Sequence, residues 1–254
     1  MNTQARWLVN INGFRLSETV IVSWIIIAGL AIASYLLTRN LKKVPESKVQ
    51  VFLEYAVLKL YNLVETTMGK ELVERIPNIV PYIGSLFLFF LCSNLVPLIG
   101  LRSPTVDLDT TLALSTITVI LIYSVSIRFN GGAVFKDMIE PTPVLLPINL
   151  VGEIARPISL SFRPFGNIMG GTLIMMLFYK LMAYISELIP GVKIPFAQFL
   201  IPVPLHLYFD IFAGSIQAFI FIMLTMVFIS NSVDISLLKK REARKLEKKK
   251  LKNA

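Results

Sequence analysis

The chain contains a segment of 20 residues, 19–38, without a single charged side chain. As an α-helix this segment is about 30 Å long, which matches the hydrocarbon thickness of a bilayer. The basic residues Arg39, Lys42 and Lys43 follow it directly. The segment therefore predicts a transmembrane helix. Because positive charge favours the cytoplasmic side, its C-terminal end is placed in the cytoplasm and the N-terminus of the chain outside.

The composition extends this interpretation to the whole chain. Hydrophobic residues make up 55% of the sequence and charged residues 16%, and the mean hydropathy is +0.69. Such values are typical of an integral membrane protein and exclude an ordinary soluble domain. The net charge of +9 is concentrated in residues 239–254, which hold nine Lys or Arg against two Glu. We expect this basic tail to lie in the cytoplasm, where anionic membrane lipid attracts it.

Two segments with different periodicity follow the first helix. In residues 46–70, apolar side chains recur at steps of three and four opposite charged ones, which predicts an amphipathic helix on the cytoplasmic face. Residues 76–128 hold two long apolar runs joined by a short outward-facing turn, which predicts a transmembrane hairpin. In this turn, Asp109 is expected to cap the start of the second run, because a carboxylate there accepts hydrogen bonds from free amide groups.

Residues 144–238 hold two apolar segments of more than forty residues each, about twice the length of a simple crossing. These two helices must tilt strongly or break, and Pro157 and Pro164 offer kinks in the first of them. The sequence therefore predicts a single all-α membrane domain over residues 1–254, with about five membrane-embedded helices and one amphipathic interfacial helix. The last two helices are expected to be long, tilted and kinked.

Arg163 lies within one of the most apolar stretches of the chain. Its guanidinium group keeps its proton at any working pH, so in hydrocarbon it costs about 3 kcal/mol or more unless something compensates the charge. An arginine in an interfacial loop would avoid this cost by reaching the lipid headgroups. The long apolar flanks on both sides argue against that placement and favour a functional arginine within the membrane.

Further polar residues share faces of the last two predicted helices. Arg163 and Asn167 are four residues apart, as are His206 and Asp210, so each pair lies on one face. Gln217 follows Asp210 by seven residues, or two turns of the same helix. A polar stripe of this kind within apolar sequence indicates a water-filled path or a buried polar interface.

Small residues predict a contact between the same two helices. Gly166 and Gly170 form a small-residue face on the first, and Ala213 and Gly214 on the second are expected to pack against it.

The sequence gives no support for metal, cofactor, catalytic or nucleic-acid chemistry. With one histidine, one cysteine and no glycine-rich phosphate loop, we expect no metal site, cofactor, catalytic residue or nucleic-acid partner.

Several stretches of the chain resemble one known family. Residues 157–167, Pro-Ile-Ser-Leu-Ser-Phe-Arg-Pro-Phe-Gly-Asn, are similar to the pattern P-x-S-L-x-x-R-L-F-G-N of subunit a (subunit 6) of bacterial F-type rotary ATP synthases. Residues 217–221, Gln-Ala-Phe-Ile-Phe, and residues 103–111 also resemble segments of that family. The resemblance covers nearly the whole chain, and Pro164 departs from it because the family usually has leucine there.

The resemblance implies roles for the polar residues near the middle of the membrane. Arg163 would be the obligatory arginine that faces the rotor ring of c subunits, with Asn167 and Gln217 beside it. Glu153, near the cytoplasmic start of the same helix, would line a half-channel open to the cytoplasm.

The outer half-channel departs from the family pattern. The family usually has an ionisable pair across its two long helices, and the corresponding residues in this chain are Thr172 and Asp210. Thr172 cannot titrate. His206, one turn before Asp210, either replaces the missing group in part or packs near the outer surface, and both interpretations stay open.

The function implied by the resemblance is that of a stator subunit in the cell (inner) membrane. The chain would provide two offset half-channels that pass H⁺ or Na⁺ to and from the c-ring, next to a b-type peripheral stalk, and would itself carry no catalytic site. A secondary ion-coupled transporter and a membrane scaffold are the alternatives. Against a transporter, no inverted repeat relates the two halves of the chain, and a scaffold gives the polar stripe no purpose.

Overall fold

The computed structural model describes most of the chain. Its described residues are 7–11, 14–45, 47–131, 134, 144, 146–187, 202–236 and 239. The predicted basic tail, apart from Lys239, lies outside them.

Within this described part, five helices are long and apolar enough to cross a membrane. They are α1 (Glu18–Thr38), α4 (Ile79–Leu95) continued by the 3-10 helix η1 (Val96–Ile99), α5 (Leu108–Asn130), α7 (Leu146–Glu187), and α10 (Gly214–Asn231) preceded by α9 (Pro202–His206) and the π-helix η4 (Leu207–Ala213). Each overlaps an apolar segment identified from the sequence. The prediction of an all-α integral membrane protein with about five membrane-embedded helices is therefore confirmed.

Two short strands precede α1 and were not anticipated. β1 (Trp7–Ile11) pairs antiparallel with β2 (Phe14–Ser17), and α1 begins at the next residue. The start of α1 is tied to the turn before α5, because the hydroxyl group of Thr19 donates to Asp107 Oδ2 at 2.6 Å. Arg102 Nη2 lies 2.8 Å from the other carboxylate oxygen of Asp107. The short 3-10 helix η2 (Pro104–Val106) lies within this turn.

The expected cap of α5 is wrong by two residues. Asp107 occupies the N-cap position, and Asp109 lies in the first turn of the helix. Asp107 makes no side-chain cap hydrogen bond, because its two oxygens bind Thr19 and Arg102 instead. Asp109 still lies where a negative charge favours the helix dipole.

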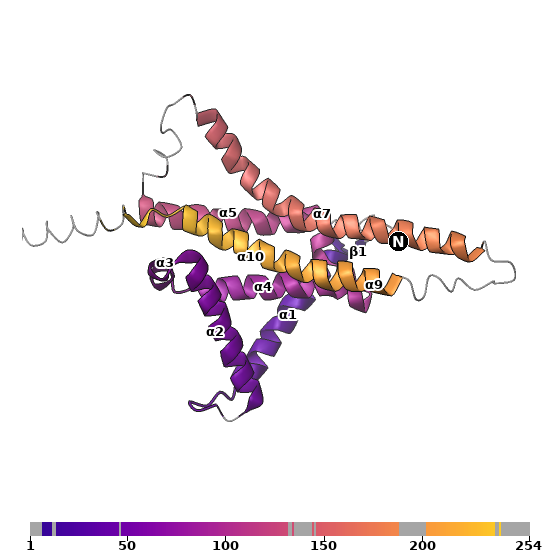
Figure 1. The fold of residues 1–254 in the computed structure, drawn as a ribbon, viewed down its shortest axis with the longest axis horizontal. Coiled ribbons are helices and arrows are strands. Elements are labelled where there is room, and N and C mark those ends of the chain that lie inside the picture. The colour runs from indigo at the N-terminus through magenta and orange to yellow at the C-terminus, as the bar shows by residue number, and fades with distance from the viewer. Residues whose placement is uncertain are drawn as a thin grey trace, which may run out of the picture.

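The amphipathic segment forms two helices, α2 (Lys48–Met68) and α3 (Lys70–Arg75). Gly69 separates them with a φ of 84°, a conformation that glycine adopts without strain. Figure 1 shows α2 leaving the other helices, so that it meets α1 only near the loop between them. The end of α2 buries Val64 and Met68, whereas Phe52 and Tyr55 are exposed. The helix α2 lies within the predicted residues 46–70, whereas α3 continues beyond them to Arg75. The place of this segment on the cytoplasmic face stays a prediction.

The core lies where α10 packs against α4, α5 and the end of α2. At its centre the rings of Phe90 and Phe221 stack with centroids 4.1 Å apart, and both side chains are fully buried. Figure 1 shows α4, α5 and α10 running side by side through this region. Apolar side chains that point away from it, such as Trp24 of α1 and Leu177 of α7, are exposed, as is usual for a surface that faces lipid.

Helix α7 has 42 residues and continues through Pro157 and Pro164. At 1.5 Å per residue it is about 63 Å long, roughly twice the hydrocarbon thickness, so it must cross the membrane at a steep tilt. Figure 1 shows that it changes direction along its length. The two prolines lack the amide hydrogen that would bond the preceding turn, which gives a physical reason for this bend.

The predicted packing of Gly166 and Gly170 against Gly214 is wrong. A Cβ atom added to Gly214 would lie 3.1 Å from Cβ of Asn94 on α4, while one added to Gly166 or Gly170 meets no atom within 4 Å. The reason is that α4 occupies this face of α10, where Asn94 Nδ2 donates to the carbonyl oxygen of Gly214 at 2.8 Å.

This close approach leads to a stability prediction. We expect Gly214→Val to lower the free energy of unfolding by about 1–3 kcal/mol, because the larger side chain pushes α4 away and stretches the Asn94 hydrogen bond. Thermal unfolding of the detergent-solubilised protein, followed by circular dichroism, measures the change. Gly29→Val is the matched control, since a Cβ atom at Gly29 of α1 meets nothing within 4 Å. Equal stability of the two variants would contradict the packing argument.

At the opposite end of the bundle, Lys239 lies next to α3. Its ammonium group is 2.9 Å from Glu71 Oε2, and Arg75 contacts the other oxygen of the same carboxylate at 3.2 Å. The hydrogen bond from Lys239 lowers the pKa of Glu71 below its ordinary value. Lys239 is thus held beside the amphipathic segment.

Candidate functional site

Arg163 lies on the exposed surface of α7. Among the residues that the structure describes, no side chain or backbone group forms a hydrogen bond or ion pair with its guanidinium group. Gly166 and Gly170 lie one and two turns further along the helix and leave the surface next to it open. A permanent cation is therefore presented outward from an apolar helix.

One turn after Arg163, Asn167 connects α7 to α10. Its side-chain amide donates to Gln217 Oε1 at 2.7 Å. Gln217 is only 1% exposed, and within the described residues its Nε2 atom is buried without a hydrogen-bond partner. The structure thus brings together two of the residues that the sequence placed beside Arg163. The hydrogen bond fixes the position of α7 relative to α10 next to the arginine.

A second polar group lies toward the start of the last long helix. His206 Nδ1 lies 2.7 Å from Asp210 Oδ2, so these two predicted residues form a pair. Tyr179 of α7 places its hydroxyl group 2.9 Å from the other ring nitrogen of His206. Thr172 does not take part, because its hydroxyl group donates to the carbonyl oxygen of Ile168 in its own helix. The contact across the two helices is therefore made by a tyrosine and a histidine.

Asp210 lies within the π-helix η4, Leu207–Ala213. The expectation that Asp210 and Gln217 share one stripe assumed two regular α-helical turns between them. In a π-helix the hydrogen bonds run from i to i+5, so the register changes before Gln217. Single π-helical turns are frequent at functional sites. On the side of α7, Gly171 allows close approach, since a Cβ atom there would lie 3.2 Å from the ring of Phe209.

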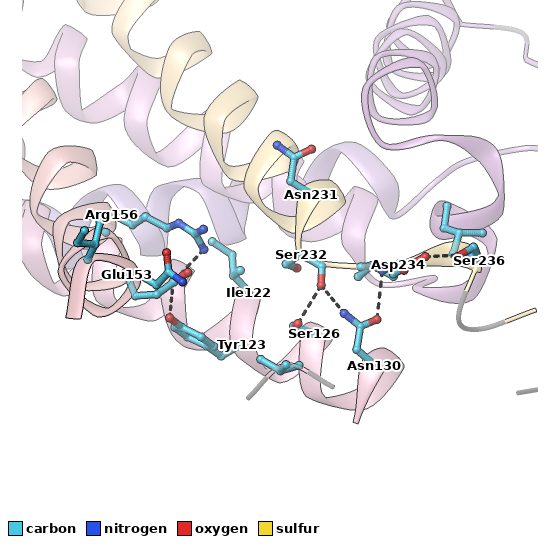
Figure 2. Close-up of a pocket in the computed structure, with 16 residues that line it drawn as sticks. Ile122, Tyr123, Ser126, Asn130, Glu153, Arg156, Asn231, Ser232, Asp234 and Ser236 are labelled. Atoms are coloured by element: carbon cyan, nitrogen blue, oxygen red, sulfur yellow. Dashed lines mark hydrogen bonds and ion pairs between the residues drawn. The ribbon is translucent and has the colours of Figure 1, made fainter. Parts of the chain in front are cut away.

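Glu153 lines a cavity of about 900 Å³ between α5, the first part of α7 and the residues after α10. Its carboxylate is 2.9 Å from Nη1 of Arg156 and accepts a hydrogen bond from the hydroxyl group of Tyr123 (Figure 2). Its side chain is 19% exposed. The predicted half-channel residue therefore faces a polar hollow, but as a paired carboxylate rather than an isolated one.

The opposite wall of this cavity is held by α5. Ser126 and Asn130 both donate to the carbonyl oxygen of Ser232 at 2.8 Å, and the amide group of Asp234 donates to Asn130 Oδ1 at 3.1 Å (Figure 2). These bonds fix the chain where α10 ends. Polar groups from three parts of the sequence thus surround the same hollow, which is polar and large enough to hold water.

The group around Glu153 and the group formed by Tyr179, His206 and Asp210 meet α7 on opposite sides of Arg163. Glu153 precedes Arg163 by ten residues and Tyr179 follows it by sixteen, which correspond to helix lengths of about 15 Å and about 24 Å. Within the described part of the chain, no group of three or more His, Cys, Asp or Glu is placed to hold a metal ion. Polar side chains therefore lie on both sides of a fixed positive charge, each at a distance from it along α7.

Three residues whose side chains contact predicted site residues were missed in the sequence. Arg156 had a usable signal, because it lies three residues after Glu153 on a helical segment. Tyr123 and Tyr179 had none, since tyrosines are common in membrane helices and their partners are 30 and 27 residues away in the chain.

Comparison with known proteins shows similarity over most of the chain. The family model described as ATP synthase A chain matches residues 20–230. A protein of Propionigenium modestum described as "ATP synthase subunit a, sodium ion specific" is 39% identical over 238 residues, which cover 87% of this chain and 75% of that protein.

Proposed function

This chain belongs to the ATP synthase A chain family, the ion-conducting stator subunits in the membrane sector of F-type ATP synthases, and we propose that Arg163 separates its two half-channels. The chain is a multi-pass membrane protein that works within a multi-subunit complex. Membership of this family argues against the alternative of a secondary transporter. The chain itself carries no catalytic site in this proposal, and its partners are an oligomeric c-ring and a b-type peripheral stalk.

One observation carries the proposal. Arg163 is an exposed cation in an apolar helix, and no described group of the chain neutralises it. A charge of this kind in the membrane needs a partner, and a carboxylate on a rotor subunit would supply it. That carboxylate is favoured in its charged form beside Arg163 and is neutralised by an incoming cation elsewhere. Rotation of the partner then becomes the route by which the cation crosses.

In this proposal, the group around Glu153 and the group around Asp210 form the two half-channels. The cavity beside Glu153 opens to the cytoplasm, and Asp210 with His206 gives access from the outside, with Thr172 at the edge of that path. The N-terminus is outside and the basic tail cytoplasmic, as the distribution of positive charge requires. Asn167 and Gln217 keep α7 and α10 in register beside Arg163.

We infer that the cation is Na⁺, because the relative from Propionigenium modestum is described as sodium ion specific. Addition of NaCl at neutral pH to the purified complex should stimulate ATP hydrolysis, and an equal concentration of KCl is the control. Equal rates in both salts would point to H⁺.

The rotor contact can be tested by crosslinking. In a Cys92→Ala background, Gly166→Cys labelled with a photoreactive maleimide should yield an adduct with the ring subunit, because this position is exposed one turn from Arg163. Gly29→Cys is the matched control, since it is an equally open glycine on α1. Absence of a ring adduct at position 166, or an equal yield at position 29, would contradict the proposed rotor face.

A further inference from the structure

Tyr179 is the residue of α7 whose side chain is hydrogen-bonded to the His206–Asp210 pair. The three side chains form a chain of contacts from Tyr179 Oη to His206 Nε2, 2.9 Å, and from His206 Nδ1 to Asp210 Oδ2, 2.7 Å. Asp210 lies in the π-helix η4 and Tyr179 in α7, so the contacts cross between the two long helical segments. The sequence pattern gave no role to this tyrosine.

The hydrogen-bonding capacity of the three groups defines what each does. A charged carboxylate is an acceptor only, so His206 Nδ1 must carry the hydrogen that Asp210 accepts. In the neutral imidazole ring, Nε2 is then an acceptor, and the hydroxyl group of Tyr179 donates to it. If the ring becomes charged, Nε2 turns into a donor, and the same hydroxyl oxygen accepts from it. The tyrosine hydroxyl group therefore holds the ring in one orientation in both states.

Without a hydrogen-bond partner such as Tyr179, little else would fix the orientation of the His206 ring. The side chain of His206 is 41% exposed and that of Asp210 is 23% exposed, so packing alone does not fix them. The ring of Tyr179 lies at 52° to that of His206 with centroids 5.9 Å apart, which is a tilted contact rather than a stack. Thr172, the residue of α7 expected opposite Asp210, bonds to its own helix instead.

We propose that Tyr179 is a positioning residue of the outer access path, which orients the ring of His206 and through it the carboxylate of Asp210. The inference rests on the proposed function, in which Asp210 receives the cation from outside. A carboxylate held at one orientation presents the same free oxygen to each arriving cation. Without the hydroxyl group of Tyr179, the imidazole ring turns, and Asp210 loses its fixed geometry but keeps its charge.

The test is Tyr179→Phe in the complete complex, reconstituted into vesicles that synthesise ATP from an ion gradient. The concentration of Na⁺ on the outer side is varied, or the outer pH if Na⁺ has no effect. We expect the apparent KM for the driving cation to rise about threefold to tenfold, the range that corresponds to the loss of one hydrogen bond. The maximal rate should stay close to that of the wild type, because Arg163 and the charge of Asp210 remain.

Tyr184→Phe is the matched control. Tyr184 lies on the same helix, is 62% exposed, and undergoes the same chemical change. A second background separates positioning from simple packing. His206→Phe keeps a ring but removes both nitrogen atoms, so Tyr179→Phe should then cause no further rise in apparent KM.

Three outcomes would overturn the inference. They are an unchanged apparent KM in Tyr179→Phe, an equal further rise in the His206→Phe background, and less assembled complex with unchanged kinetics. The last outcome would make the contact a structural tie between helices. Failure of the proposed function looks different, because Asp210→Asn would then show wild-type kinetics. An impaired Asp210→Asn with a normal Tyr179→Phe would reject only the role of Tyr179.

Discussion

Replacement of Arg163 with alanine is expected to abolish ion-driven ATP synthesis while the complex still assembles. The fold should tolerate the change, because the guanidinium group has no hydrogen bond or ion pair within the described part of the chain. The loss of ATP synthesis is expected because Arg163 acts on the rotor subunit. Without the fixed cation, a rotor carboxylate passing between the half-channels can stay neutral, so the driving ions leak across without enforcing rotation.

Resealed vesicles containing the variant complex provide the measurement. ATP synthesis should fall to the level of uncoupled vesicles, while ATP hydrolysis by the catalytic sector continues. Arg39→Ala is the control, because Arg39 is also exposed but lies at the end of α1, which lines neither the cavity beside Glu153 nor the His206–Asp210 pair. Synthesis at the wild-type rate in Arg163→Ala would reject the assignment of Arg163.

Apolar length was sufficient to predict the membrane helices. Residues 19–38 and α1 (Glu18–Thr38) agree within one residue, because a charge-free run has definite ends. The finer features depend on contacts that are distant in sequence. The cap of α5 moved to Asp107 because Thr19, 88 residues away, and Arg102 bind its carboxylate. Such competition between partners cannot be seen in a local pattern.

In the candidate site too, contacts within one helical segment could be predicted from the sequence, whereas contacts between helices could not. The helical spacing of four correctly paired His206 with Asp210, because their contact lies within one helical segment. The family resemblance placed Asn167 and Gln217 beside Arg163 but did not predict their contact with each other, which the structure shows at 2.7 Å across two helices. The hydrogen bond of Tyr179 was not predictable, because it depends on how far α7 and the π-helix are rotated toward each other.

The π-helix itself has no simple sequence signal. Pro202 and Pro204 lie just before it, and Gly214 ends it beside Asn94 of α4. A regular α-helix was the natural expectation for this apolar run. The widened turn places Asp210 at a point where the helical register changes, which is a typical location for a functional group.

The second large effect is expected for Asp210→Asn. Asparagine keeps the shape of the side chain, and its amide oxygen can still accept the hydrogen bond from His206 Nδ1, so assembly should be normal. The change removes the negative charge. If this carboxylate attracts or relays cations from outside, ion-driven ATP synthesis should fall several-fold, while hydrolysis by the detached soluble catalytic sector is unchanged.

Asp109→Asn distinguishes a local role from a general effect of surface charge. Asp109 is an exposed carboxylate in the first turn of α5, and it loses the same charge without any described side-chain partner. Its synthesis rate should therefore stay near that of the wild type. If Asp210→Asn assembles and also synthesises ATP at the wild-type rate, the Asp210 carboxylate only links η4 to His206. The outer path would then have to run past other polar groups, because a cation that crosses apolar sequence needs oxygen ligands or water at every step.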